Sequence, residues 1–206
     1  MAQTFIGITI GPNIAKWNGT DPANIFQGST SLTSMTGFFL SVPVESRQFD
    51  HLSFVQEIAW SQKGTGLDLN EVVNGIPVTG TARIVINNLE YGAFIKGYYP
   101  FGNNEVFAFA GPTMGIAIAG SMAVKSSGNG NNGQTTVKES IDLEEWGYKR
   151  FEWGIGFGTG VTIPAGKSRF SVLLRYQFGL TDVDKGEGPN AVIRNRVLNF
   201  SLGYSL

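Results

Sequence analysis

Apolar and polar residues alternate along most of the chain with a period of two, which is the pattern of β-strands that have two different faces. No long segment has the spacing of an amphipathic helix, and none approaches the roughly 18 consecutive apolar residues of a membrane-spanning helix. We therefore predict strands near residues 4–13, 35–45, 51–61, 82–100, 105–122, 150–163, 168–181 and 194–206.

The connections between these strands alternate in length. Those near residues 46–50, 101–104 and 164–167 are short, whereas the connections over 14–34, 62–81, 123–149 and 182–193 are long and polar. A bacterial transmembrane barrel has this layout, with short periplasmic turns, longer external loops and both termini on the periplasmic side. The sequence thus predicts an all-β fold, an eight-stranded antiparallel up-and-down transmembrane β-barrel, as a single domain over residues 1–206.

The two faces of the predicted strands differ in size as well as polarity. In the sixth strand, large apolar residues such as Trp153 and Phe157 alternate with glycine at 154, 156, 158 and 160. This alternation fits a membrane barrel and also a soluble lipocalin-like barrel with an apolar cavity. The glycine row favours the membrane barrel, because it suits a narrow, crowded lumen better than an exterior surface.

Aromatic residues gather near the ends of the predicted strands. Trp60, Trp153 and Tyr176 fall toward the external ends, and Tyr99, Phe170 and Tyr204 toward the periplasmic ends, as interfacial girdles would. Gln56 interrupts the apolar face of the third strand, which indicates either a bulge or a local error in register. A shift of one residue would exchange the lumen face for the lipid face.

Composition and charge narrow the class of protein. A net charge of -1 and a pI near 5.8 give no basic field for nucleic acid. The absence of cysteine excludes disulfides and thiolate metal sites. Residues 1–4 lack a secretory signal, so we interpret the chain as the mature form of a protein from the outer membrane of a diderm, Gram-negative bacterium.

Six polar residues are predicted to point into the lumen. In an eight-stranded barrel the interior is just wide enough for side chains, so we expect a plug of paired charges. Lys96 is expected near Glu57, and Arg175 within reach of Glu57 or Glu90. A proton or ion path and a buried ligand site remain alternatives. The predicted lumen residues are Glu57, Glu90, Lys96, Glu152, Arg175 and Gln177.

The sequence predicts no catalytic, cofactor or metal site, and we do not expect an enzyme. The single histidine, His51, falls at a periplasmic turn, away from the external rim where a barrel hydrolase would need it. Asp182, Asp184 and Glu187 could supply oxygen ligands to Ca²⁺, but their spacing departs from the calcium-loop pattern. We interpret them as a solvated loop, and the low-complexity run 126–134 as a loop without assigned function.

Several short segments resemble the PorT-like outer-membrane β-barrel proteins common in Bacteroidota. The resemblance rests on segments 57–64 (EIAWSQKG), 89–96 (LEYGAFIK), 109–115 (FAGPTMG), 175–181 (RYQFGLT) and 196–204 (RVLNFSLGY). It implies a small barrel of OmpA- and OmpX-like architecture in an outer membrane. The chain departs from the family pattern at Leu206, where an aromatic residue is commoner, and at Tyr91-Gly92, which replaces an aliphatic-proline step.

Three functions are compatible with this sequence. The first is a closed membrane anchor or interaction scaffold that acts through its long external loops or by docking to a larger envelope complex. The second is a narrow channel for water, protons or small ions, and the third is a soluble binder of apolar ligands. Outer-membrane lipid is the expected surrounding, and the sequence leaves partner identity and oligomeric state open.

Overall fold

A computed structural model of the chain describes residues 3–19, 29–73, 76–127, 134–184 and 192–206. Within those ranges the regular secondary structure consists of strands. None of the described segments forms a helix that is long and apolar enough to cross a membrane. The strands are β1 (Gln3–Gly19), β2 (Ser29–Thr33), β3 (Met35–Phe49), β4 (Leu52–Val73), β5 (Ile76–Phe101), β6 (Asn104–Ser127), β7 (Gln134–Ile141), β8 (Phe151–Ala165), β9 (Ser168–Gly179) and β10 (Ile193–Ser205).

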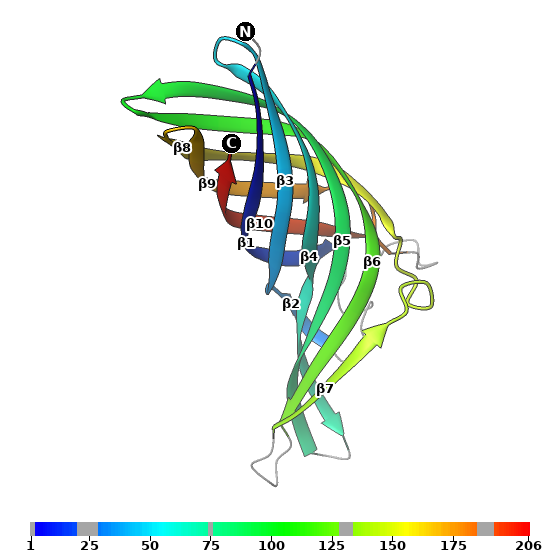
Figure 1. The fold of residues 1–206 in the computed structure, drawn as a ribbon. Coiled ribbons are helices and arrows are strands. Elements are labelled where there is room, and N and C mark those ends of the chain that lie inside the picture. Colours follow the sequence, from blue (N-terminus) through cyan, green and yellow to red (C-terminus); the bar gives the residue numbers. More distant parts are fainter. Residues whose placement is uncertain (1–2, 20–28, 74–75, 128–133, 185–191) are drawn as a thin grey trace.

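Eight of these strands form a closed antiparallel ring (Figure 1). The ring runs β1–β3–β4–β5–β6–β8–β9–β10, and β10 pairs with β1 to close it. Each strand therefore lies beside the next ring strand in the sequence, which is up-and-down topology. The two short strands lie off the ring, β2 against β4 and β7 against β6. The predicted fold class is confirmed.

The three connections predicted to be short are two-residue turns between paired strands. They lie at residues 50–51, 102–103 and 166–167, at the same end of the barrel as both chain termini. His51, Gly102 and Gly166 take positive φ angles of 68°, 62° and 66°, which tight hairpin turns require. We call this the turn end of the barrel, and the opposite end the extended end.

The prediction of long polar loops at the extended end was wrong for residues 14–19 and 29–33, for most of residues 62–81, and for residues 123–127 and 134–141, all of which form strands. The largest difference lies in β4 to β7. There β4, β5 and β6 continue as a paired sheet beyond the closed ring, with β7 added to β6 (Figure 1). The glycine-rich sequence Gly64-Thr65-Gly66 has the composition of a turn, yet its backbone stays in the ladder opposite Ile84. Residues 128–133 of the low-complexity run, and Glu187 of the carboxylate group, lie outside the described residues.

Most large apolar side chains of the ring strands face outward and most inward ones are small or polar, as the membrane interpretation predicts and a lipocalin-like barrel does not. Phe151, Trp153, Ile155 and Phe157 of β8 are exposed, between buried neighbours such as Glu152. The glycine row of β8 makes room for three phenylalanine rings inside the barrel. A Cβ atom on residues 156, 158 and 160 would lie 3.0, 2.8 and 2.5 Å from the rings of Phe94, Phe109 and Phe107.

The strand pairings show where the predicted registers are regular and where they are interrupted. Gln56 faces outward in an uninterrupted ladder, opposite Val44 and Ala93, so neither a bulge nor an error in register lies there. The irregularities fall elsewhere, between Arg47 and Phe49 and between Asn87 and Asn88. Of the predicted girdle residues, Tyr204 packs against Phe170 at 5.3 Å between ring centroids.

Candidate functional site: the charged interior and its apolar cap

The inward faces of the strands carry three clusters of charged side chains, one above the other along the barrel. The first cluster lies near the turn end. Glu105 accepts two hydrogen bonds from Arg47 at 2.9 and 2.6 Å and one from Arg169 at 2.6 Å. Glu45 accepts hydrogen bonds from Lys96 at 2.7 Å and from Arg47 at 2.8 Å. Two carboxylates and three cations thus form one connected network.

The middle cluster is centred on one bidentate pair. Arg175 of β9 donates two hydrogen bonds, at 2.6 and 2.9 Å, to the carboxylate of Glu57 on β4, which also accepts one from Ser41. The Arg175 guanidinium lies 5.1 Å from the ring centroid of Phe94 and 5.3 Å from that of Phe109. The guanidinium is therefore packed against aromatic rings.

The third cluster lies toward the extended end. Lys63 of β4 lies between two carboxylates, 2.7 Å from Glu90 and 3.3 Å from Glu152. Asn195 donates a 2.9 Å hydrogen bond to Glu152, and Gln177 donates one of 3.4 Å to Glu90. Lys63 is only 1% exposed, so its charge depends on these two neighbours.

All six residues that the sequence places in the lumen lie inside the barrel in the structure. Of the two partners considered for Arg175, it contacts Glu57. Lys96 contacts Glu45 and not Glu57, because Lys96 lies opposite Ser53, four residues closer to the turn end. Glu90 and Glu152 share Lys63 instead of an arginine.

Five interior charges were missed by the sequence reasoning. Glu45 has the same parity as Ser41 in β3, so strict alternation could have found it. Lys63 fell in a predicted loop, and Arg169 and Glu105 stand next to turns, where inward orientation is hard to predict. The missed residues are Glu45, Arg47, Lys63, Glu105 and Arg169. With them, the described interior holds five cations and five carboxylates.

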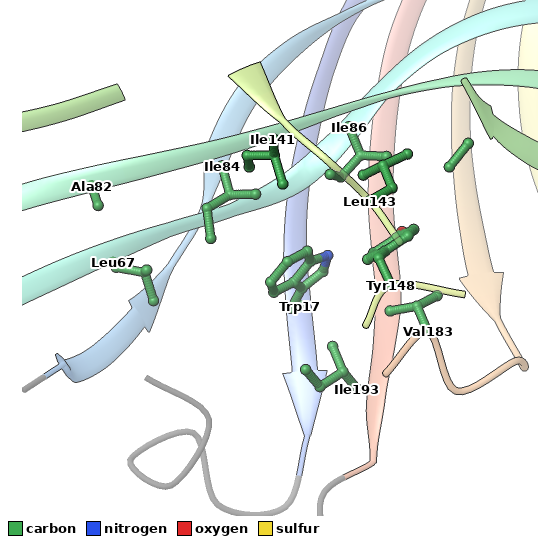
Figure 2. Packing of buried hydrophobic residues seen from close by; sticks show 11 residues of the cluster. Trp17, Leu67, Ala82, Ile84, Ile86, Ile141, Leu143, Tyr148, Val183 and Ile193 are labelled. Atoms are coloured by element: carbon green, nitrogen blue, oxygen red, sulfur yellow. The ribbon is translucent and has the colours of Figure 1, made fainter. Parts of the chain in front are cut away.

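An apolar cluster lies beyond the third charged cluster, at the extended end. Trp17 of β1 stacks on Tyr148 with 6.2 Å between ring centroids, and Ile84, Leu143 and Val183 pack around them (Figure 2). Each of these residues is less than 9% exposed. Burial raises the pKa of the Tyr148 phenol, and the charge of Glu152 raises it further. We call this cluster the apolar cap. Its members are Trp17, Leu67, Ala82, Ile84, Ile86, Ala117, Ile141, Leu143, Tyr148, Val183 and Ile193.

A cavity of about 70 Å³ lies between the turn-end cluster and the Arg175–Glu57 pair. Phe94, Phe107 and Phe109 line one side, and Ser171 and Gly203 are among the residues on the other. This volume has room for a few water molecules and is far below the roughly 300 Å³ of a typical small-molecule site. The arrangement can hold water beside buried charges.

Among the described residues, no three His, Cys, Asp or Glu side chains gather in a group that could hold a metal ion. Asp182 is instead a structural residue. Its carboxylate accepts hydrogen bonds from the backbone N–H groups of Asp184 and Ile193, at 3.2 and 2.9 Å, and from Lys149 at 3.4 Å. His51 lies in the turn between β3 and β4, stacked on Tyr99.

Comparisons with known proteins agree with the barrel fold seen in the structure. Residues 1–185 match a family model described as "Outer membrane protein beta-barrel domain". No curated protein matches the sequence. Among solved structures, the chain resembles Neisserial surface protein A, with a TM-score of 0.54 and 11% identity over 100% of this chain and 98% of that one. This likeness supports the fold alone.

Two other solved barrels match over nearly their whole length with lower similarity. Ail, the attachment invasion locus protein of Yersinia pestis, has a TM-score of 0.43 and 12% identity over 99% of both chains. The N-terminal β-barrel domain of OprF from Pseudomonas aeruginosa has a TM-score of 0.38 and 8% identity over 100% of both chains.

Proposed function

The chain belongs to the outer membrane protein β-barrel domain family, and we propose that it is a closed anchor that presents an external sheet to an extended segment of a partner protein. In such barrels the short turns face the periplasm. The turn end is then periplasmic and the extended end external. Within the family, segments 57–64 and 175–181 support a PorT-like barrel of a Gram-negative bacterium of the Bacteroidota.

The observation that carries the proposal is the edge of the external sheet. β7 pairs with β6 along Gly120–Ser127, and among the described residues no strand pairs with its other edge. Residues 136–140 of β7 are exposed on both faces of the sheet. An unpaired edge has free backbone N–H and C=O groups, which an extended peptide can bind by adding a strand.

The closed barrel supports this role mechanically. The interior is filled by paired charges and the apolar cap, which also fixes residues 141–148 next to β7. A rigid support that presents a strand edge reduces the ordering cost of binding. The barrel itself serves as the membrane anchor. The PorT-like resemblance favours a partner that is part of a larger envelope complex, to which this same edge would dock.

Photocrosslinking in cells tests this proposal. A crosslinking amino acid at Glu139, on the exposed edge strand, is expected to give one discrete protein adduct, whereas the same group at Lys167 in a periplasmic turn gives none of that mass. Replacing Val137 or Lys138 with proline removes a backbone N–H group. Because successive N–H groups of a strand point to opposite edges, one of these two residues directs its N–H to the free edge of β7.

At least one of these proline variants should abolish the adduct, and alanine at the same position should keep it. Barrel closure in each variant is checked by the change in gel mobility on heating. Adducts that persist in both folded proline variants would contradict binding by strand addition.

A further inference from the structure

Three cations lie together on the outward surface of β1 and β10, near the extended end. Lys16 of β1 lies directly opposite Arg196 of β10, and Arg194 follows on the same face, opposite Asn18. Lys16 and Arg194 are exposed, and Arg196 is half-buried. We call these three residues the basic patch.

The basic patch begins where the outward apolar band ends. Along β1 the exposed residues Ile6, Ile8, Ile10 and Ile14 precede Lys16, and along β10 Leu202, Phe200 and Leu198 precede Arg196 from the other direction. At the turn end the band is bordered by Thr4, Ser46 and Ser168 instead. The basic patch therefore lies at the border of the apolar band on the side of the extended end.

Among the described residues, no carboxylate forms a salt bridge with the basic patch. Like charges directly opposite on neighbouring strands repel each other. The outward neighbours on β1, β9 and β10 are apolar or neutral, namely Ile14, Asn18, Phe178 and Leu198.

Arg196 is held in a fixed position despite this repulsion. Its guanidinium lies 3.5 Å from the ring centroid of Phe178, and Nη1 donates to the carbonyl oxygens of Gly179 at 2.7 Å and Asn195 at 2.9 Å. Nε and Nη2 have no hydrogen bond within the described chain. A planar guanidinium with free donors suits a phosphate group, which accepts parallel hydrogen bonds.

We propose that the basic patch binds a phosphate group of an anionic lipid headgroup in the external leaflet of the membrane. The position of the basic patch favours a lipid, because the patch adjoins the apolar band that contacts acyl chains. Charge favours a phosphate, because one dianionic group can neutralise two opposed cations. The site is separate from the external edge of β7 and from the interior charges.

The test uses the full barrel in detergent micelles and native mass spectrometry. The probe is a glycolipid that carries two phosphates, compared with the same glycolipid after removal of both. Wild type is expected to bind the phosphorylated lipid as a discrete one-to-one complex. Because each surface cation contributes about 1 kcal/mol to anionic-lipid binding, K16A/R196A should bind roughly thirtyfold more weakly.

Three further variants distinguish binding at the basic patch from a general effect of surface charge. Lys167→Ala removes one cation at the turn end and should bind like wild type, whereas K16A, which removes one cation of the basic patch, should bind more weakly. Arg196→Lys keeps the charge without the planar donors and should bind with intermediate affinity. Equal affinity of wild type and folded K16A/R196A for the phosphorylated lipid would overturn the proposal. So would equal binding of the dephosphorylated lipid, or full displacement by an equal concentration of inorganic phosphate.

Discussion

Arg175 on β9 and Glu57 on β4 bind each other across the interior of the barrel, by two hydrogen bonds of 2.6 and 2.9 Å. β4 and β9 are not neighbours in the ring, so this pair ties two opposite walls together. Arg175 is 8% exposed and Glu57 is 4% exposed. Each group therefore depends on the other for compensation of its desolvated charge.

Removing one partner of this pair should destabilise the barrel strongly. We expect Arg175→Met to lower the free energy of unfolding by about 3–5 kcal/mol, because Glu57 is left as an uncompensated buried charge. The measurement is urea unfolding in lipid vesicles, followed by tryptophan fluorescence. The double variant R175M/E57M should recover most of the loss. If the double variant lost as much free energy of unfolding as R175M and E57M lose together, the two residues would not be coupled.

Adding a methyl group to the glycine row should also destabilise the barrel. A Cβ atom at residue 160 would overlap the backbone carbonyl oxygen of Val172 and lie 2.5 Å from the Phe107 ring, so Gly160→Ala is expected to cost about 1–3 kcal/mol. The temperature at which the folded gel band disappears measures the effect. Gly166→Ala, in a turn with open space around it, tests strain from φ alone. F107L should relieve only the part of the G160A loss that comes from the ring. Unchanged stability of G160A would show that both the ring and the neighbouring backbone of Val172 move to make room for the methyl group.

The sequence predicted the strands that carry strict alternation and failed where composition resembles a turn. In β8 the pattern from Phe151 to Ile163 defined both faces correctly, because every outward residue except Thr159 is large and apolar and most inward residues are glycine. Around Gly64 and Gly66 the residues are small and polar, and the strand is fixed instead by its long pairing with β5. Pairing over such distance leaves little trace in local composition.

The candidate site was predictable only in part for a related reason. Arg175 and Glu57 lie in well-patterned strands, and their contact follows from inward orientation at a common depth. Lys63, which joins Glu90 to Glu152, required knowing that β4 continues past residue 61. The apolar cap was not predicted, since Trp17, Leu143 and Val183 come from three segments assigned to loops.

A closed interior should not conduct ions. Planar-bilayer recordings on wild type and on Arg175→Ala are both expected to show no reproducible conductance steps. Arg175→Ala removes a side chain only from the middle cluster. The charged cluster at the turn end and the apolar cap remain on either side of it. A larger barrel with an open lumen, recorded in the same bilayer, is the positive control. Reproducible steps in wild type that change in Arg175→Ala would favour the channel hypothesis instead.

Alkaline pH should loosen the apolar cap through Tyr148. Burial raises the pKa of this phenol in the folded protein, whereas the unfolded chain has a value near 10. The neutral phenol is therefore favoured on folding. Its contribution is fully present below about pH 10 and is lost as the pH rises above that value, by up to about 1.4 kcal/mol per pH unit.

Tyr148→Phe removes the titrating group and isolates this effect. The hydroxyl accepts a 3.3 Å hydrogen bond from Asn195, so the variant should be slightly less stable than wild type at pH 8. Between pH 10 and 11.5 its free energy of unfolding should fall less steeply than that of wild type, because the lysines and exposed tyrosines titrate in both proteins. Parallel pH profiles would mean that the cap opens before Tyr148 ionises, and that burial in the apolar cap does not control its titration.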